Sequence, residues 1–287
     1  MSEMEISTEK FWALRDKIRR QLFKGLNEPQ FQVVENGAGP LLCLAGAGSG
    51  KTTAMVNRVL HLLIFGPVYQ EKGYIPADLQ KEDLQSMEQW LAAQKGKRTF
   101  TPLPRRILDL ISYQGVEPCS VLAITFTNKA AQEMKDRLAL LVGPLVNEMW
   151  VMTFHAACVR ILRQDIEALG YKRDFGIYDT QDQLQVIKDV LKQLDLDEKK
   201  FTPRYLNQVI SRFKSELKTP QKAEYTARGY MEEVAAKVYE RYQELLRNNN
   251  SLDFDDLIML TVRLFQEHPQ ILEKYRQRFR YILVDEY

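Results

Sequence analysis

A glycine-rich octapeptide from Ala45 to Thr52 (AGAGSGKT) constrains this chain more than any other stretch. An apolar run from Pro40 to Leu44 precedes it, and apolar residues recur at helical spacing from Thr53 to Phe65. A short buried strand, a turn and a helix are therefore predicted in this order. Glycines let such a turn direct several backbone N–H groups inward, and the helix start adds its dipole. The stretch is predicted to be a P-loop, which binds nucleotide phosphates.

The P-loop assigns a role to each polar side chain. Lys51 is expected to reach the β and γ phosphates, and the Thr52 hydroxyl a Mg²⁺ ion. The strict pattern begins with glycine, where this chain has the small residue Ala45. Upstream, the amide of Gln30 could offer one donor and one acceptor to an adenine edge. The predicted nucleotide contacts are Gln30, Ala45, Gly46, Ala47, Gly48, Ser49, Gly50, Lys51, Thr52 and Thr53.

The composition sets the broad class. A chain of 287 residues can form one large or two smaller domains, and its net charge of +2 means that a nucleic acid would have to meet a local basic face. The 3 cysteines and 3 histidines form no metal-ligand cluster. No apolar run is long enough to span a bilayer. A protein of the reducing cytoplasm, without a membrane partner, is expected.

Strand and helix patterns alternate along much of the chain. Strands are predicted at Val121–Phe126 and Trp150–Phe154, each followed by a helix, and Tyr281–Val284 forms a last apolar strand. This alternation predicts an α/β fold with a parallel sheet flanked by helices. Between Trp150–Phe154 and Tyr281–Val284 the sequence pattern becomes purely helical from Asp179 onward. A capping box is predicted from Thr180 to Gln183, and helix starts are predicted at Thr202-Pro203 and Thr219-Pro220.

The predicted domain boundaries follow this pattern of strands and helices. Residues 1–160 and 251–287 are assigned to the α/β domain, and residues 161–250 to an inserted all-helical subdomain. Residues 66–118 are too many for an ordinary connection and are predicted to be a further insertion. An N-terminal amphipathic helix over Thr8–Lys24 is predicted. Its apolar face carries Phe11, Leu14, Ile18 and Leu22, and Arg15, Arg19 and Arg20 are expected to face solvent.

Two acidic residues follow the last predicted strand. Asp285 and Glu286 lie at its carboxyl end, where an α/β sheet positions its chemistry. With a P-loop in the same sheet, they are interpreted as a Walker B pair, in which one carboxylate holds Mg²⁺ and the other activates water. The alternative is a pair of acidic residues without a role.

Five stretches together resemble the UvrD/PcrA/Rep group of superfamily 1 DNA helicases. They are Ala45–Thr52, Ile124–Met134, Thr153–His155, Ser251–Ile258 and Val284–Tyr287. The resemblance implies a RecA-like motor domain, interrupted by a helical subdomain, that hydrolyses ATP with Mg²⁺ while moving 3′ to 5′ on single-stranded DNA.

The resemblance also implies residue roles. Gln30 would read adenine, Lys51 and Thr52 would hold phosphates and Mg²⁺, Asp285 would be the metal ligand and Glu286 the catalytic base. Phe126 would stack on a base, although it could instead belong to the core. The residues implied in DNA binding are Thr125, Phe126, Thr127, Asn128, Thr153, His155 and Phe254.

The chain departs from the family in three places. Thr53 stands where many members have an arginine that packs on adenine, Glu28 intervenes between Asn27 and Pro29, and no family counterpart is assigned to the 66–118 insertion. The chain also ends at Tyr287, before a second RecA-like domain. It is interpreted as the N-terminal portion of a helicase, nearly inactive alone, with single-stranded DNA or a duplex junction and the C-terminal half as partners. The alternatives are a P-loop kinase and an ATP- and DNA-binding module without turnover.

Overall fold

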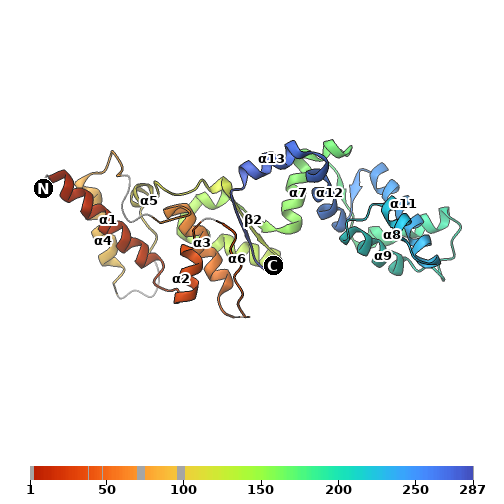
Figure 1. Ribbon diagram of the computed structural model, residues 1–287, viewed down its shortest axis with the longest axis horizontal. Helices are drawn as coiled ribbons and strands as arrows, with labels where there is room; N and C mark the ends of the chain where they lie inside the picture. The colour runs from red at the N-terminus through yellow and green to blue at the C-terminus, as the bar shows by residue number, and fades with distance from the viewer. Residues whose placement is uncertain (1–2, 38, 47, 70–74, 96–100, 287) are drawn as a thin grey trace. The chain divides into compact units, whose positions relative to one another are not determined.

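The computed structural model describes residues 3–37, 39–46, 48–69, 75–95 and 101–286 (Figure 1). The chain forms two compact units. The first unit comprises Met1–Thr153 and Arg278–Tyr287, and the second comprises Phe154–Gln277. The second unit extends beyond the predicted 161–250 subdomain on both sides.

A parallel sheet lies at the centre of the first unit. Its strands are β1 (Val121–Thr125), β2 (Trp150–Thr153) and β5 (Tyr281–Val284), in the order β2-β1-β5. Both pairings are parallel, and Ala123 of β1 is in register with Val151 and Leu283. The predicted α/β fold with a parallel sheet flanked by helices is confirmed.

Three helices connect this sheet to the P-loop. Helix α6 (Asn128–Val142) packs on β1 and β2, while α3 (Lys51–Phe65) packs against α6 and against α2 (Glu28–Glu35). Helix α3 is buried on most sides, as expected of its apolar sequence. Its side chains join those of the sheet in one hydrophobic core that includes Val56, Val59, Val121, Ala123, Met134, Leu138 and Val151.

The predicted strand before the P-loop is wrong. Residues 40–46 adopt no strand in the described structure, and Leu42 and Leu44 are 65% and 86% exposed. A strand requires a backbone partner as well as apolar side chains, and a short apolar run alone does not distinguish strand from other structure. Ile282 on β5 is also 60% exposed. The apolar side chains of Leu42 and Leu44 are therefore not buried, although the sequence pattern predicts a buried strand.

The N-terminal helix α1 (Glu3–Leu22) buries a wider face than the one predicted. Phe11, Leu14 and Ile18 are buried as expected, but Arg15 and Arg19 are buried too. Aromatic rings contact both guanidinium groups. The Arg15 guanidinium lies 4.7 Å from the Tyr113 ring centroid and donates to the Ile111 carbonyl. Cation–π contacts explain why helical periodicity misassigned these arginines.

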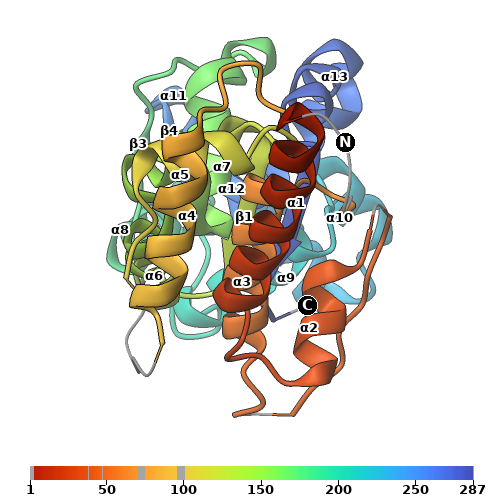
Figure 2. The same cartoon turned by 90° about the vertical axis from the view of Figure 1, so that its left-hand side faces the viewer.

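The 66–118 segment contributes to the same core. Helix α4 (Lys81–Ala93) packs on α1, and α5 (Arg105–Ile111) packs on α3 and α4 (Figure 2). Leu84, Met87 and Trp90 of α4 belong to the hydrophobic core of the first unit. The segment therefore covers α1 and α3 rather than forming a separate lobe.

The two ends of this segment meet. A Cβ atom at Gly115 would lie 2.0 Å from the Leu63 carbonyl oxygen, and one at Gly66 would lie 2.3 Å from that of Gln114. The Val116 N–H donates to the Leu62 carbonyl at 2.9 Å. Only glycine permits such close approach of two backbones.

The second unit is built mainly of helices. Its core contains side chains from α8 (Thr180–Gln193), α9 (Pro203–Ser215), α10 (Pro220–Thr226) and α11 (Tyr230–Asn248). The remaining elements are α7 (Phe154–Asp165), α12 (Phe254–Glu267), α13 (Pro269–Arg278, the last residue of which belongs to the first unit) and a short parallel pair, β3 (Gly176–Ile177) with β4 (Ser251–Leu252). Short 3-10 helices also occur: η3 (Ile166–Leu169) lies in this unit, and η1 (Pro118–Ser120) and η2 (Gly143–Glu148) lie in the first.

Helix caps explain most of the boundaries in this unit. Thr202 and Thr219 cap α9 and α10 as predicted. The capping box of α8 is formed by Asp179 and Asp182, one residue before the predicted Thr180–Gln183 pair. A carboxylate at the N-cap satisfies two free N–H groups, those of Gln181 and Asp182. In the described residues, every helix is too short or too polar to cross a membrane.

Candidate functional site

Two glycines with left-handed backbone conformation form the turn of the P-loop. Gly48 and Gly50 have φ angles of +76° and +84°, which side chains with a Cβ rarely adopt. The Ser49 N–H and hydroxyl both point to the Gly46 carbonyl, at 3.3 and 2.7 Å. Ala47, predicted as a contact, lies outside the described residues. The result is a tight turn that leads directly into α3.

The N-terminus of α3 is available to an anion. Its N-cap is Gly50, which has no side chain to accept from the first N–H groups of the helix. Such N–H groups and the helix dipole favour phosphate. Lys51, the first residue of α3, bends over the loop and donates to the carbonyls of Ala45 and Gly46 at 3.0 and 3.1 Å. Its ammonium therefore lies at the loop that would hold the phosphates.

Gln30 lies beside the P-loop. It is in the first turn of α2, where its Oε1 accepts from the Asn27 N–H at 3.2 Å and its Nε2 donates to the Ser49 carbonyl at 3.0 Å. A Cβ at Gly50 would lie 2.5 Å from this Nε2. The amide retains one hydrogen and one lone pair for another partner. Glu28 and Pro29 form the first turn, so the departure before Gln30 still produces a capped helix.

Thr52 and Asp285 converge from opposite ends of the chain. The Thr52 Oγ1 lies 3.5 Å from Asp285 Oδ2. Asp285 follows β5, and its N–H donates to the Ile124 carbonyl of β1 at 2.9 Å. The next residue, Glu286, has a φ of +62° and is exposed. Asp285 is thus fixed by the sheet, whereas Glu286 turns away from the strand direction. Tyr287 lies outside the described residues.

The hydroxyl and carboxylate oxygens fit Mg²⁺. This ion prefers hard oxygen ligands, keeps several waters and uses few protein carboxylates together with substrate phosphates. Within the described part of the chain, no group of three or more His, Cys, Asp or Glu side chains could hold a metal. Thr52 and Asp285 would therefore share the ion with a nucleotide. Thr53 is the next residue, and its backbone carbonyl accepts a hydrogen bond from the Asn57 side-chain amide at 2.8 Å.

Polar and aromatic residues line the carboxyl ends of β1 and β2. Thr125 and Thr153 are buried register partners on these neighbouring strands. Thr125 Oγ1 donates to the Thr127 carbonyl at 3.1 Å, and the Thr127 hydroxyl accepts from the Ala130 N–H as the cap of α6. Asn128, the first residue of α6, is exposed. The two threonines therefore support this edge from within.

Phe126 projects from that edge. Its side chain is 71% exposed, although it directly follows five buried strand residues. The alternative that Phe126 belongs to the core is therefore wrong. An exposed ring beside capped helix residues is available to stack on a flat partner.

Two predicted residues meet in the second unit. The rings of His155 on α7 and Phe254 on α12 have centroids 5.6 Å apart and planes inclined at 66°. Phe254 is 51% exposed. An edge-to-face pair of this kind orients both rings. Phe154, which directly follows β2 and is 37% exposed, was missed by sequence reasoning because it ends an apolar strand pattern.

A buried ionic cluster holds the start of α12. The Lys214 ammonium lies 2.6 Å from Asp253 and 2.8 Å from Asp256, and all three side chains are almost fully buried. Tyr242 donates to Asp253 at 2.9 Å. Burial alone lowers the pKa of Lys214, but the carboxylates of Asp256 and Asp253 outweigh this and raise the pKa. Since Asp253 is the N-cap of α12, the cluster fixes the residue that precedes Phe254.

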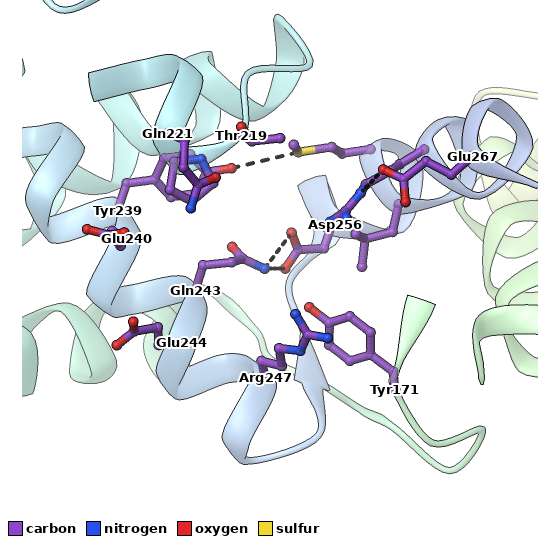
Figure 3. Close-up of a pocket in the computed structure, with 14 residues that line it drawn as sticks. Tyr171, Thr219, Gln221, Tyr239, Glu240, Gln243, Glu244, Arg247, Asp256 and Glu267 are labelled. Atoms are coloured by element: carbon purple, nitrogen blue, oxygen red, sulfur yellow. Dashed lines mark hydrogen bonds and ion pairs between the residues drawn. The ribbon is translucent and has the colours of Figure 1, made fainter. Parts of the chain in front are cut away.

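A pocket of about 330 Å³ opens beside this cluster (Figure 3). Gln243 on α11 directs its amide Nε2 to both oxygens of Asp256 at 3.2 Å, and Tyr171 and Arg247 form part of the wall. None of the predicted nucleotide contacts lines this pocket. This pocket is therefore distinct from the P-loop site.

The amino-acid sequence of this chain is similar to those of known DNA helicases. The chain is 42% identical over 270 residues to the ATP-dependent DNA helicase PcrA of Bacillus subtilis (strain 168). The aligned region covers 94% of this chain and 30% of that protein. It is 42% identical over 266 residues to PcrA of Staphylococcus aureus (strain Mu50), covering 93% and 30%. The chain thus spans about 30% of the length of these curated relatives.

The family comparison covers most of the chain. The UvrD/REP helicase N-terminal domain matches residues 26–72 and 96–287. The unmatched internal part, 73–95, is narrower than the predicted 66–118 insertion and contains α4. The chain belongs to the UvrD/REP helicase N-terminal domain family.

Proposed function

We propose that this chain is the N-terminal motor portion of an ATP-dependent helicase that moves 3′ to 5′ on single-stranded DNA. The convergence of Thr52 and Asp285 beside a P-loop with a free helix N-terminus supports this most directly. The family match and the PcrA relatives support the same reading. In this proposal the RecA-like motor comprises 1–160 and 251–287 and the helical subdomain 161–250, so residues 154–160 and 251–277 of the compact second unit are assigned to the motor.

ATP hydrolysis would use the residues of the first unit in distinct roles. The P-loop N–H groups and Lys51 bind the phosphates, Thr52 and Asp285 hold Mg²⁺, and Gln30 contacts adenine. A Mg²⁺ ion held by Thr52 and Asp285 would supply positive charge to the bound phosphates. Glu286 accepts the proton of the attacking water, since an exposed carboxylate directly after the metal ligand is suited to act as general base.

DNA contact would rest on exposed aromatic groups. Phe126 stacks on a base, while Thr125, Thr127, Asn128 and Thr153 support and extend its edge. In the second unit His155 orients Phe254 as a further stacking group. Single-stranded DNA or its junction with a duplex is the proposed partner, together with a C-terminal RecA-like half absent from this chain.

The measurement that tests this function is DNA-stimulated phosphate release. We expect very slow release from residues 1–287, because arginines from a second domain contribute roughly 10³ to 10⁵ in rate in such motors. A chain lengthened to the size of its relatives should hydrolyse ATP rapidly when single-stranded DNA is added. Phosphate transfer to a small metabolite would favour the kinase alternative, and DNA and ATP binding without turnover in the lengthened chain would favour a binding module.

A further inference from the structure

We propose that Arg19 is a positioning residue for base recognition, because its ion pair with Glu35 fixes the helix that carries Gln30. The inference rests on the proposed role of Gln30 in contacting adenine. It concerns α1, which precedes the first residue of the family match at position 26. Neither Arg19 nor the helix that carries it belongs to the matched part of the chain.

Helix α2 depends on its neighbours for its orientation. It has eight residues, and helices of this length are marginal in water without tertiary contacts. Its N-terminal end is held by the Asn27–Gln30 capping box and by the bond from Gln30 to the Ser49 carbonyl. These bonds involve the same amide that would contact adenine, so a second anchor must fix the helix for the amide to remain in position.

Two arginines supply that anchor at the other end of α2. Arg58 of α3 donates to the carbonyls of Val34 and Gly37 at 2.6 and 2.9 Å. Arg19 of α1 forms an ion pair with Glu35, the last residue of α2. Its guanidinium also lies 5.7 Å from the ring centroid of Phe31, directly after Gln30. Arg19 therefore contacts α2 at both its charged end and its apolar face.

Arg19 is itself held in place. Its side chain is 9% exposed, it donates to Asp16 at 3.2 Å, and its guanidinium lies 4.0 Å from the ring centroid of Tyr69. A cation fixed by a carboxylate and a ring loses little further freedom on pairing with Glu35. Figure 2 shows α2 near the C-terminal end of α1, and Arg19 belongs to the last turn of α1. The contact is therefore pre-organised, unlike a flexible surface pair.

This arrangement separates recognition of the base from recognition of the phosphates. Moving α2 would displace Gln30 from adenine, but Lys51 and the N-terminus of α3 lie on a different helix. Loss of the Arg19–Glu35 pair should therefore lower the preference for adenine without lowering affinity for a triphosphate. A merely structural role would weaken every nucleotide alike.

The test is competition of ATP and GTP against a fluorescent ribose-labelled ATP, on the 287-residue chain and on its lengthened form. In Arg19→Met we expect the ATP-to-GTP affinity ratio to fall several-fold, toward that of Gln30→Ala, with GTP affinity unchanged. Glu35→Gln should do the same, and the double variant should be no worse than either single variant, because both remove one interaction. Arg20→Met is the matched control, since Arg20 also pairs with Asp16 but is 71% exposed.

The outcomes separate the two claims. An unaltered ratio in Gln30→Ala would remove the proposed role of Gln30 itself. A ratio lowered by Gln30→Ala but kept in both Arg19→Met and Glu35→Gln would overturn the positioning role and leave the proposed function standing. An equal loss of ATP and GTP affinity in both variants would also overturn it, since Arg19 would then act through general stability. If Arg19→Met does not fold, Glu35→Gln carries the test alone, because Glu35 is more exposed than Arg19.

Discussion

Thr52 Oγ1 and Asp285 Oδ2 lie 3.5 Å apart although 233 residues separate them in the chain. Thr52 lies in the first turn of α3, and Asp285 follows β5, the strand at the opposite end of the order β2-β1-β5 from β2. The long excursion between them returns the chain so that both oxygens can face one cation. This convergence is the basis of the predictions on catalysis that follow.

Replacement of Lys51 by alanine should greatly weaken nucleotide binding. The ammonium lies at the loop, within hydrogen-bond distance of the Ala45 and Gly46 carbonyls. A hydrogen bond to a charged group contributes about 1.5–3 kcal/mol, or roughly a 10- to 150-fold change in affinity. Calorimetric titration with ATP measures it. Lys24→Ala, an exposed lysine after α1, serves as the control. Equal ATP affinity in both variants would contradict the role of Lys51.

Replacement of Glu286 by glutamine should separate binding from turnover in the lengthened chain. The amide cannot accept the proton of water, so hydrolysis should fall by roughly 10²- to 10⁴-fold. ATP affinity should stay the same, because Glu286 is not a proposed metal ligand. Single-turnover hydrolysis and ATP titration together give the answer. Normal hydrolysis would assign the base to another residue.

Replacement of Phe126 by alanine should weaken binding of single-stranded DNA by about 1–3 kcal/mol. The dependence of affinity on salt should change little, because it counts phosphate contacts rather than stacked bases. Fluorescence anisotropy at several salt concentrations measures both quantities. Leu140→Ala is a matched control, since Leu140 is also 71% exposed. If both variants bind DNA like the original chain, Phe126 does not contact bases.

Replacement of Lys214 by methionine should destabilise the second unit by roughly 3–5 kcal/mol, because it leaves two buried carboxylates without their cation. Urea unfolding measures the loss. Lys222→Met, at an exposed position on α10, should be neutral. A variant with unchanged stability would show that Asp253 and Asp256 do not need the ammonium.

Acid should destabilise the chain through His61. Burial, with help from Arg58 and Arg19, lowers the pKa of His61 from 6.5 to about 3. Between these values the unfolded chain binds a proton that the folded chain does not, so stability falls as the pH falls below 6.5. The loss reaches roughly 2 kcal/mol at pH 5. Above pH 6.5 the group is neutral in both states and has no effect.

Urea unfolding at pH 7 and pH 5 measures this linkage. His61→Leu should lose about 2 kcal/mol less than the original chain over that interval. His268→Leu, in the second unit, is the control. Identical pH dependence in His61→Leu and the original chain would mean that folding does not lower the pKa of His61.

Local patterns predicted the elements that depend on local chemistry. The Thr202 and Thr219 caps and the strand at Tyr281–Val284 were all found, because capping and apolar strands are encoded in a few adjacent residues. Motif spacing also indicated that Asp285 lies at the carboxyl end of a strand. The P-loop residues were identified for the same reason.

Features that depend on distant partners were missed. The burial of Arg15 and Arg19 requires aromatic rings from residues 65–113, which no helical periodicity reveals. The Pro40–Leu44 segment is apolar but unpaired in the described structure, because strand formation depends on a neighbouring edge. Lys214 lies 39 residues before its carboxylate partner Asp253, so its role could not be read from a linear pattern.

The closeness of Gly66 and Gly115 gives the molecule a natural splice point. The chain leaves the end of α3 and returns to the same backbone carbonyls, so the path of the sheet is independent of how many residues lie between. A longer, shorter or different segment can therefore join the same two ends without changing the sheet, provided that it still covers α1 and α3. The same point is where an engineer would graft a fluorescent reporter or a targeting module.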